Sequence, residues 1–186
     1  MKPLVNVSRV IVGVLFIFSG LVKANDPHGL SYKMQEFFDV WAQTPSLTSM
    51  MHWLSDYALA FSLIMITLEI IVGVGILLGI WKKFFSWLLL LLIIFFSFLT
   101  GYAVLSGKIA TCGCFGDCIP LTAMQSFIKD LVLLVLILII FFGIKYLTPV
   151  LMPALNFFLL LVSCLLVIGF QWFVMRFSKP RRASRR

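Results

Sequence analysis

The sequence predicts an all-α integral membrane protein: a four-helix transmembrane bundle followed by a fifth, C-terminal transmembrane helix. The chain is 62% hydrophobic and only 12% charged, which is more apolar surface than a soluble domain can cover. The apolar residues also form five runs of roughly 18 residues or more, which is long enough to cross a bilayer. These expected spans are residues 5–22, 57–80, 84–105, 126–144 and 151–174.

The predicted organisation is one membrane domain with two polar connections and a tail. Residues 1–147 form the four-helix part, which carries an interfacial connection at 24–55 and a cysteine loop at 106–125. Residues 148–175 form the fifth helix, and residues 176–186 form a basic tail. We interpret the tail as a segment that contacts anionic lipid headgroups or marks a cytoplasmic end. The net charge of +8 therefore indicates the lipid bilayer, and no nucleic acid, as a partner.

The first span carries small and basic residues on one helical face. Successive steps of four, three, four and three residues join Arg9, Gly13, Phe16, Gly20 and Lys23. The glycines predict close approach of a neighbouring helix. We expect Arg9 to reach the interface by snorkelling or to pair with an acidic residue. The stretch also resembles a signal peptide cleaved after Ala24, but Lys23 in the cleavage region argues against cleavage.

The connection at 24–55 contains a predicted amphipathic helix. Met34, Phe37, Phe38 and Trp41 recur at steps of three, one and three residues, and charged side chains lie between them. This spacing places the apolar side chains on one helical face. We expect the helix to lie in the membrane interface.

Glu69 lies near the middle of the second span. An ionised carboxylate among lipid tails costs several kcal/mol on the order of insertion scales, so Glu69 is expected to face the bundle and to be paired or protonated. One interpretation is a structural ion pair with Arg9, and the other is a proton carrier or a quinone-site group. Lys129 and Asp130, in the first turns of the fourth span, lie at the depth of the cysteine loop.

Three of the four cysteines fall within seven residues, in the loop between the third and fourth spans. Only Gly113 separates Cys112 from Cys114, so a disulfide between them would close a small, strained ring, and strain makes a disulfide easier to reduce. Cys118 is close enough in the chain to act as a resolving thiol. These three cysteines are therefore the candidate catalytic residues of thiol–disulfide exchange.

Two other interpretations of the cysteine loop remain. A tetrahedral metal site needs four ligands, and the loop supplies only three cysteines. The fourth, Cys164, lies within the fifth span, where we expect it to be a small buried apolar residue. We therefore expect no metal at the loop. A disulfide that only clamps the loop is the second alternative.

Three stretches together resemble a known family: the face from Arg9 to Lys23, Leu68-Glu69 followed by Gly73, and Cys112-Gly-Cys-Phe-Gly-Asp. They resemble the MauE/DoxX family of redox-associated membrane proteins, in the Bacteroidetes-like DoxX form with a Cys-Gly-Cys-Phe-Gly motif, over about residues 5–147. The resemblance implies a compact four-helix bundle with disulfide or thiol handling on the periplasmic side. It also implies that Cys112 and Cys114 are the motif cysteines and Glu69 the acidic residue of the second helix. Other branches are linked to quinone-coupled sulfur oxidation.

The resulting hypothesis is a bacterial inner-membrane protein whose Cys112/Cys114 pair exchanges disulfides with a periplasmic thioredoxin-like protein or a substrate protein. Glu69 would manage protons, and a quinone is a candidate cofactor. Two alternatives are a membrane assembly or scaffold subunit with a structural disulfide, and a small-molecule binding or transport protein built around Glu69.

The charges conflict with this orientation. With five spans, the cysteine loop and the basic tail lie on the same side of the membrane. Placing both outside leaves five basic residues inside, against ten of the fifteen outside, which is the reverse of the positive-inside rule. We nevertheless expect a periplasmic loop, because a strained disulfide persists only in an oxidising compartment.

Overall fold

The structure is a computed structural model that describes residues 2–43, 48–106, 122–150 and 152–177. Its helices are α1 (Lys2–Asn25), α2 (Pro27–Trp41), α3 (Thr48–Asp56), α4 (Ala58–Leu78), α5 (Lys82–Ser106), α6 (Ala123–Phe142), the 3-10 helix η1 (Ile144–Tyr146) and α7 (Pro153–Phe177). Within the described residues, α1, α4, α5, α6 and α7 are long and apolar enough to cross a membrane. The predicted fold class is confirmed.

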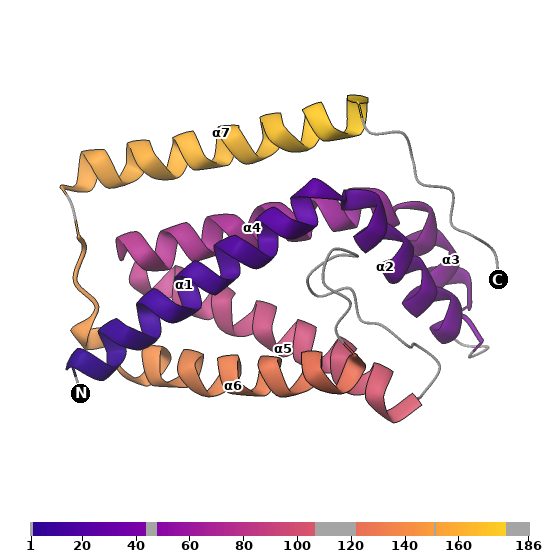
Figure 1. Ribbon diagram of the computed structural model, residues 1–186, viewed down its shortest axis with the longest axis horizontal. Coiled ribbons are helices and arrows are strands. Elements are labelled where there is room, and N and C mark those ends of the chain that lie inside the picture. Colours follow the sequence, from indigo (N-terminus) through magenta and orange to yellow (C-terminus); the bar gives the residue numbers. More distant parts are fainter. Residues whose placement is uncertain (1, 44–47, 107–121, 151, 178–186) are drawn as a thin grey trace.

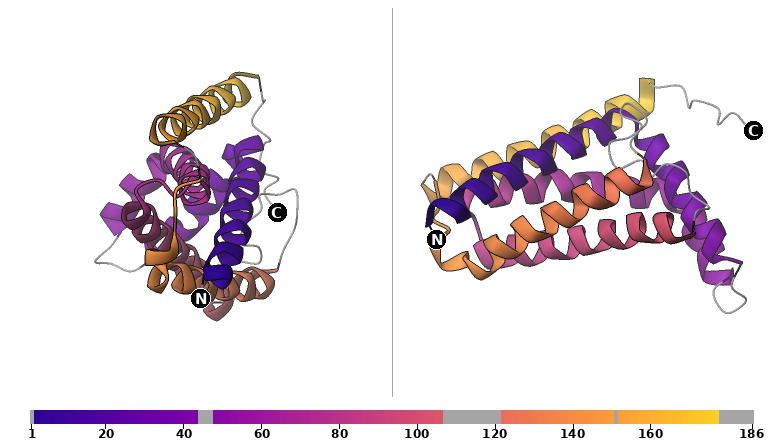
Figure 2. Two further views of the ribbon diagram at one scale, coloured as in Figure 1. Left: turned by 90° about the vertical axis from the view of Figure 1, so that its left-hand side faces the viewer. Right: turned by 60° about the horizontal axis from the view of Figure 1, so that its bottom comes forward.

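The long helices α1, α4, α5 and α6 run side by side in alternating directions (Figure 1). Helix α7 lies outside this bundle, where it contacts α4 and α1 (Figure 2). The end of α1, the helices α2 and α3, the end of α5 and the start of α6 lie together at one end of the bundle (Figure 1). We call this the α2 end. The N-terminus and the α4–α5 turn lie at the opposite end.

Close approach of α1 to α4 depends on the predicted glycine face. A Cβ added at Gly73 would lie 2.8 Å from Cγ1 of Ile17 and 3.0 Å from the carbonyl oxygen of Gly13. A Cβ added at Gly20 would lie 2.4 Å from Cγ1 of Ile70. No side chain fits in these gaps without movement, so the glycines set the distance between the two helices.

Helix α2 is the predicted amphipathic helix, and its apolar face packs on the bundle. Asp26 caps the helix by accepting a hydrogen bond from the backbone N–H of Gly29 at 3.1 Å. Met34, Phe37 and Phe38 are buried. The apolar side chains of α2 therefore cover part of this end of the bundle. Cys164 on α7, which we expected to be buried, is only partly buried.

Candidate functional site

The predicted catalytic residues Cys112, Cys114 and Cys118 lie outside the described residues, so their roles stay predictions. The chain leaves the bundle at Ser106, the last residue of α5, and re-enters it at Thr122, both at the α2 end (Figure 1). Thr122 Oγ1 accepts a hydrogen bond from the Gln125 backbone N–H at 3.3 Å, and the Gln125 side chain accepts one from the Thr122 N–H at 3.1 Å. This capping box starts α6.

A buried ion pair joins α1 to α4 at the α2 end. Lys23 Nζ donates hydrogen bonds to both carboxylate oxygens of Glu69, at 2.9 and 2.7 Å. The two side chains are 2% and 4% exposed. Lys23 Nζ also lies 4.3 Å from the centre of the Phe96 ring on α5, a cation–π distance. Glu69 therefore faces the bundle and is paired, as predicted.

The prediction that Glu69 pairs with Arg9 was wrong. Arg9 precedes Lys23 by 14 residues, or about 21 Å along a helix axis at 1.5 Å per residue, which exceeds the reach of its side chain. Arg9 lies at the opposite end of the bundle and donates to the carbonyls of Ile76 (2.8 Å) and Thr148 (2.9 Å). It also donates to the carbonyl of Leu77. Ile76 and Leu77 belong to the last turn of α4, whose carbonyls lack N–H partners within the helix.

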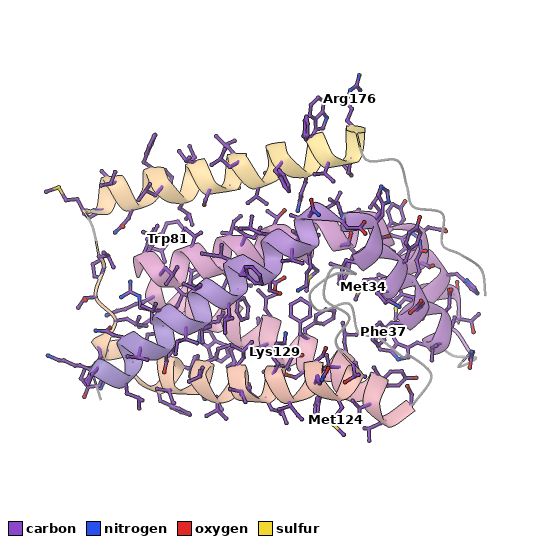
Figure 3. All side chains as sticks on the ribbon, in the orientation of Figure 1. Met34, Phe37, Trp81, Met124, Lys129 and Arg176 are labelled. Atoms are coloured by element: carbon purple, nitrogen blue, oxygen red, sulfur yellow. The ribbon has the colours of Figure 1, made fainter. Side chains whose placement is uncertain are left out.

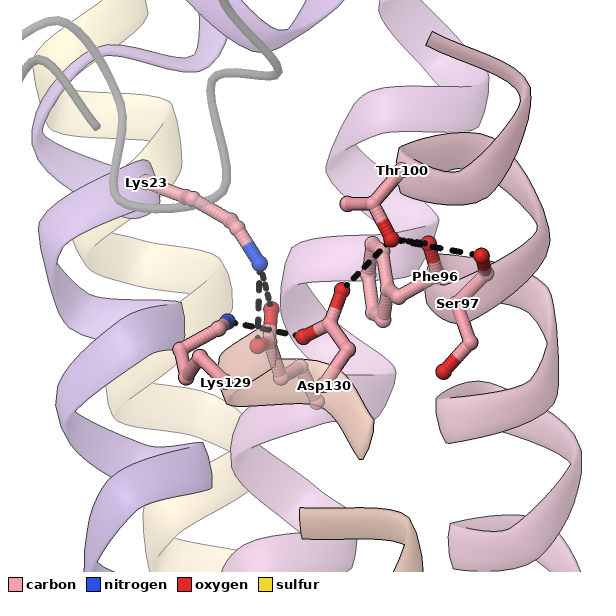
Figure 4. A network of polar contacts seen from close by, with 7 residues as sticks. Lys23, Phe96, Ser97, Thr100, Lys129 and Asp130 are labelled. Atoms are coloured by element: carbon pink, nitrogen blue, oxygen red, sulfur yellow. Dashed lines mark hydrogen bonds and ion pairs between the residues drawn. The ribbon is translucent and has the colours of Figure 1, made fainter. Parts of the chain in front are cut away.

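A second ion pair lies beside the first, on α6. Lys129 Nζ is 2.9 Å from Oδ1 of Asp130, and the Asp130 side chain is 1% exposed. Thr100 Oγ1 on α5 donates to Oδ2 of Asp130 at 3.1 Å. Figure 4 shows Asp130 held between Lys129 and Thr100, with Lys23 close by. Four helices therefore contribute to one buried polar group.

The two ion pairs line a common cavity of about 20 Å³, together with Ser19 and Phe96 among others. A cavity of this size has room for about one water molecule. The site holds two cations and two anions, so its formal charges balance. Replacing buried ion pairs by apolar side chains of similar volume is often neutral or stabilising. Stability alone therefore does not account for a group of charged side chains in a membrane bundle of which three, those of Lys23, Glu69 and Asp130, are buried.

The sequence contained a signal for the Lys23–Glu69 pair. Lys23 follows Gly20 by three residues, and Glu69 precedes Gly73 by four. Each charged residue thus shares a helical face with a glycine that marks the contact between α1 and α4. That face of α1 also carries Arg9, and the register, in which Gly13 lies against Gly73, is what places Lys23 opposite Glu69. The partners of Asp130 carried no comparable signal, because they depend on the rotation of α5 and α6.

A larger cavity of about 230 Å³ lies between α1, α4 and α7, and it is lined by Leu21, Ala24, Ile70, Leu166, Val167 and Phe170. None of these side chains can donate a hydrogen bond to the oxygens of a quinone. The cavity between the ion pairs is polar but too small for a quinone ring. Neither of these two cavities fits a quinone headgroup.

Figure 3 shows the side chains of this membrane bundle, with Lys129 on α6 and Met34 and Phe37 at the α2 end. A sequence model of the family described as methylamine utilisation protein MauE matches residues 1–143. Protein TlpB of Flavobacterium psychrophilum is 31% identical over 137 residues, which cover 72% of this chain and 35% of that protein. The chain thus spans about a third of the length of this relative. No solved structure matches the chain.

The family match covers the four helices of the bundle, both buried ion pairs and the segment with three cysteines. It extends over more than half of the 186 residues. The chain therefore belongs to the MauE family of membrane proteins.

Proposed function

We propose that the chain is a membrane thiol–disulfide exchange protein in which Cys112 and Cys114 form the exchanging pair and Cys118 resolves the mixed disulfide. The observation that carries the proposal is the presence of three cysteines within seven residues, on the connection between α5 and α6. That connection starts and ends at the α2 end, where the buried ion pairs lie. Membership of the MauE family and the resemblance to the DoxX form support the proposal.

The proposed chemistry needs no reagent besides the disulfide of a partner protein. One motif thiolate attacks that disulfide, whose S–S bond breaks as a mixed disulfide forms and one partner sulfur leaves as a thiolate. The Cys118 thiolate attacks the mixed disulfide and releases the other partner sulfur, and the remaining thiolate of the pair then displaces Cys118, which leaves the Cys112–Cys114 disulfide. The motif loses two electrons and two protons, and the partner gains both. The reverse reaction follows the same steps.

The proposed partner is a thioredoxin-like protein or a substrate protein in the periplasm, and the proposed location is the bacterial inner membrane. A thioredoxin-like protein suits the chemistry because it presents a disulfide that an attacking thiolate can reach. The periplasm suits it because a strained motif disulfide persists where the surroundings are oxidising.

A redox titration separates this proposal from a purely structural disulfide. The purified chain, with Cys164→Ser to remove the cysteine of α7, would be equilibrated with glutathione buffers and its free thiols alkylated and counted. We expect a midpoint within the range of about −120 to −270 mV that catalytic thiol proteins span. A midpoint below about −300 mV is typical of structural disulfides. That result would contradict the proposal and favour a scaffold protein with a clamped loop.

Trapping in cells tests which cysteine attacks. Variants that keep Cys112 alone or Cys114 alone cannot complete the second step, so one of them should accumulate a protein adduct that reductant removes. A variant without cysteines is the matched negative control. If neither single-cysteine variant forms an adduct while the unaltered motif cycles in the titration, the assigned roles of the two cysteines are wrong.

The third interpretation, a small-molecule site built around Glu69, has less support. Glu69 is occupied by Lys23 on both oxygens, and the cavity beside it is about 20 Å³. A drug-sized ligand needs a pocket of roughly 300 Å³ or more. The geometry at Glu69 therefore favours an ion pair over a ligand site.

A further inference from the structure

The cavity of about 230 Å³ between α1, α4 and α7 has a buried wall and an exposed rim. The wall is formed by side chains that are at most 6% exposed, namely Ala24, Ile70 and Val167. The rim is formed by side chains that are at least 41% exposed, namely Leu21, Leu166 and Phe170. Protein therefore closes the cavity on the side of the bundle, and the cavity opens where α1 and α7 face outward.

The cavity lies at the depth of the lipid chains. The helices α1, α4 and α7 are each long and apolar enough to cross a membrane. Phe170 lies seven residues before the end of α7, or about 10 Å along the axis at 1.5 Å per residue. Ile70 lies 12 residues after the start of α4, or about 18 Å. Because the hydrocarbon core of a bilayer is about 30 Å thick, the cavity opens to lipid chains and not to headgroups or bulk water.

The chemistry and size of the cavity suit an alkyl chain. All six lining side chains are apolar. An apolar cavity of about 150 Å³ stays dry and binds benzene. This cavity, at about 230 Å³, therefore has room for an alkyl segment longer than about six carbons. Its lining loses dispersion contacts if the space stays empty, so entry of a neighbouring lipid chain is favourable.

Hydrogen bonds tie α7 to α4 and keep the cavity from closing. Just before α7 begins, the Val150 N–H donates to the carbonyl oxygen of Leu78, the last residue of α4, at 3.2 Å. Near the end of α7, Gln171 Nε2 donates to the carbonyl oxygen of Leu63 at 3.4 Å, and Gln171 Oε1 accepts from Thr67 Oγ1 at 3.2 Å. Moving α7 against α1 would strain these bonds in surroundings where unpaired polar groups are costly. The separation of α7 from α1 is therefore set from the α4 side.

We propose that this cavity binds one hydrocarbon chain of a membrane phospholipid, which enters from the side of the bundle. The bound chain fills the space between α1 and α7 (Figure 2). Helices in a bilayer associate through packing and polar contacts, without a hydrophobic driving force, so the contacts of the lipid chain help to hold α7 on the bundle. The family match ends at residue 143, so the wall that α7 contributes lies outside it. The site does not involve the cysteines.

Photolabelling of buried side chains tests the proposal. The purified chain would be placed in phosphatidylcholine nanodiscs in which a small fraction of the lipid carries a diazirine midway along one acyl chain. After irradiation, peptide mass spectrometry would map the labelled residues. We expect labels on Ile70 and Val167, which a lipid chain contacts only if it enters the cavity. Ile66 and Ile76 flank Ile70 on α4, are each 0% exposed, and should stay unlabelled. Ile94 on α5 is 50% exposed and is the positive control for surrounding lipid.

Filling the cavity with a larger side chain should remove the labels. Ala24→Leu fills it from α1, and Val167→Phe fills it from α7. Either variant should reduce labelling of Ile70 to the level of the flanking isoleucines, while the exposed positive control keeps its labelling. Val135→Phe, at a position of α6 that is 58% exposed, is the matched control and should leave Ile70 labelled. Val167→Phe serves as the test if Ala24→Leu fails to fold.

Three outcomes would overturn the inference. If Ile94 is labelled but Ile70 and Val167 are not, no phospholipid chain enters; a prenyl lipid carried from the cell, or a helix of a second copy of the chain, would give this result by occupying the cavity. Labels on Ile66 and Ile76 as well would mean that the bundle opens to lipid as a whole. Labelling of Ile70 that persists in both filled variants does not arise from the cavity. The redox midpoint of the cysteines is measured separately, so failure here leaves the proposed function standing.

Discussion

Burial of Lys23 and Glu69 removes two charges from water, and the cost is offset only while each side chain has the other as its partner. The ammonium and the carboxylate are 2.7 Å apart, and the Phe96 ring covers the ammonium. The pair therefore behaves as a unit, in contrast to Arg9, which stabilises the end of α4 through backbone carbonyls. Lys23 and Arg9 both lie on the glycine face of α1, but Lys23 pairs with the Glu69 side chain, whereas Arg9 donates hydrogen bonds to the backbone at the end of α4.

A double-mutant cycle measures the coupling energy between Lys23 and Glu69. Lys23→Met or Glu69→Leu alone should lower the free energy of unfolding by about 3–5 kcal/mol, because each leaves an uncompensated buried charge. The double variant should lower it by much less than the sum, and denaturant unfolding in detergent micelles would report all three values. The exposed pair Lys33–Glu36 is the control, with an expected coupling below about 1 kcal/mol. Additive losses at Lys23 and Glu69 would contradict a coupled pair.

At the scale of elements, the contact between α1 and α4 determines where the buried charges meet. The glycines remove side chains from the contact, which lets the two helices lie close enough for Lys23 to reach Glu69. The backbone oxygen of Gly13 lies 3.0 Å from the position of a Cβ at Gly73, and backbone moves less readily than a side chain. The two ion pairs thus depend on a helix contact that is made by glycines, which have no functional side chain.

Gly73→Ala tests this dependence. We expect it to lower the free energy of unfolding by about 1–3 kcal/mol, the usual cost of overpacking. Gly169 on α7 is the control, because an added Cβ meets no atom within 4 Å there. Gly169→Ala should be neutral or stabilising by up to about 1 kcal/mol, as in other helices. Thermal unfolding in detergent would compare the two variants. Equal effects of Gly73→Ala and Gly169→Ala would show that α1 and α4 leave enough space for a side chain at position 73.

The sequence was sufficient to predict the long helices, but it predicted only part of the site with the two ion pairs. Five spans and the glycine face follow from hydropathy and helical spacing, which are local properties of the chain. The pairing of Glu69 did not follow, because Arg9 and Lys23 share one face and only the register against α4 distinguishes them. Asp130 was recognisable as a polar residue at the right depth, but its contact with Thr100 depends on how α5 and α6 rotate against each other.

For the whole molecule, the alternation of the long helices places α3 and the end of α7 at the same end of the molecule and the α4–α5 turn at the opposite end (Figure 1). The basic residues at the latter end are partly engaged by the protein itself. Arg9 donates to Thr148, and Lys82 Nζ donates to the carbonyl of Leu147 at 3.1 Å. Arg9 and Lys82 therefore have a structural role at this end of the bundle, whichever side of the membrane it faces. The positive-inside count is accordingly a weaker guide to orientation for this chain.

Labelling of single cysteines decides the orientation. In a chain without native cysteines, Asp56→Cys and Arg176→Cys would report the α2 end and Lys83→Cys the opposite end; all three positions are exposed. With five spans and a periplasmic cysteine loop, a membrane-impermeant maleimide should label the first two in intact spheroplasts. It should label Lys83→Cys only after permeabilisation.

Each alternative arrangement gives a different labelling pattern. If α7 fails to span, Arg176→Cys will label with Lys83→Cys, and the basic tail then lies opposite the cysteine loop. If all three reporters are reversed, the bundle spans as described but the cysteine loop faces the cytoplasm. In that compartment glutathione and thioredoxin keep thiols reduced, and exchange through Cys112 and Cys114 would have to run with the motif as the electron donor.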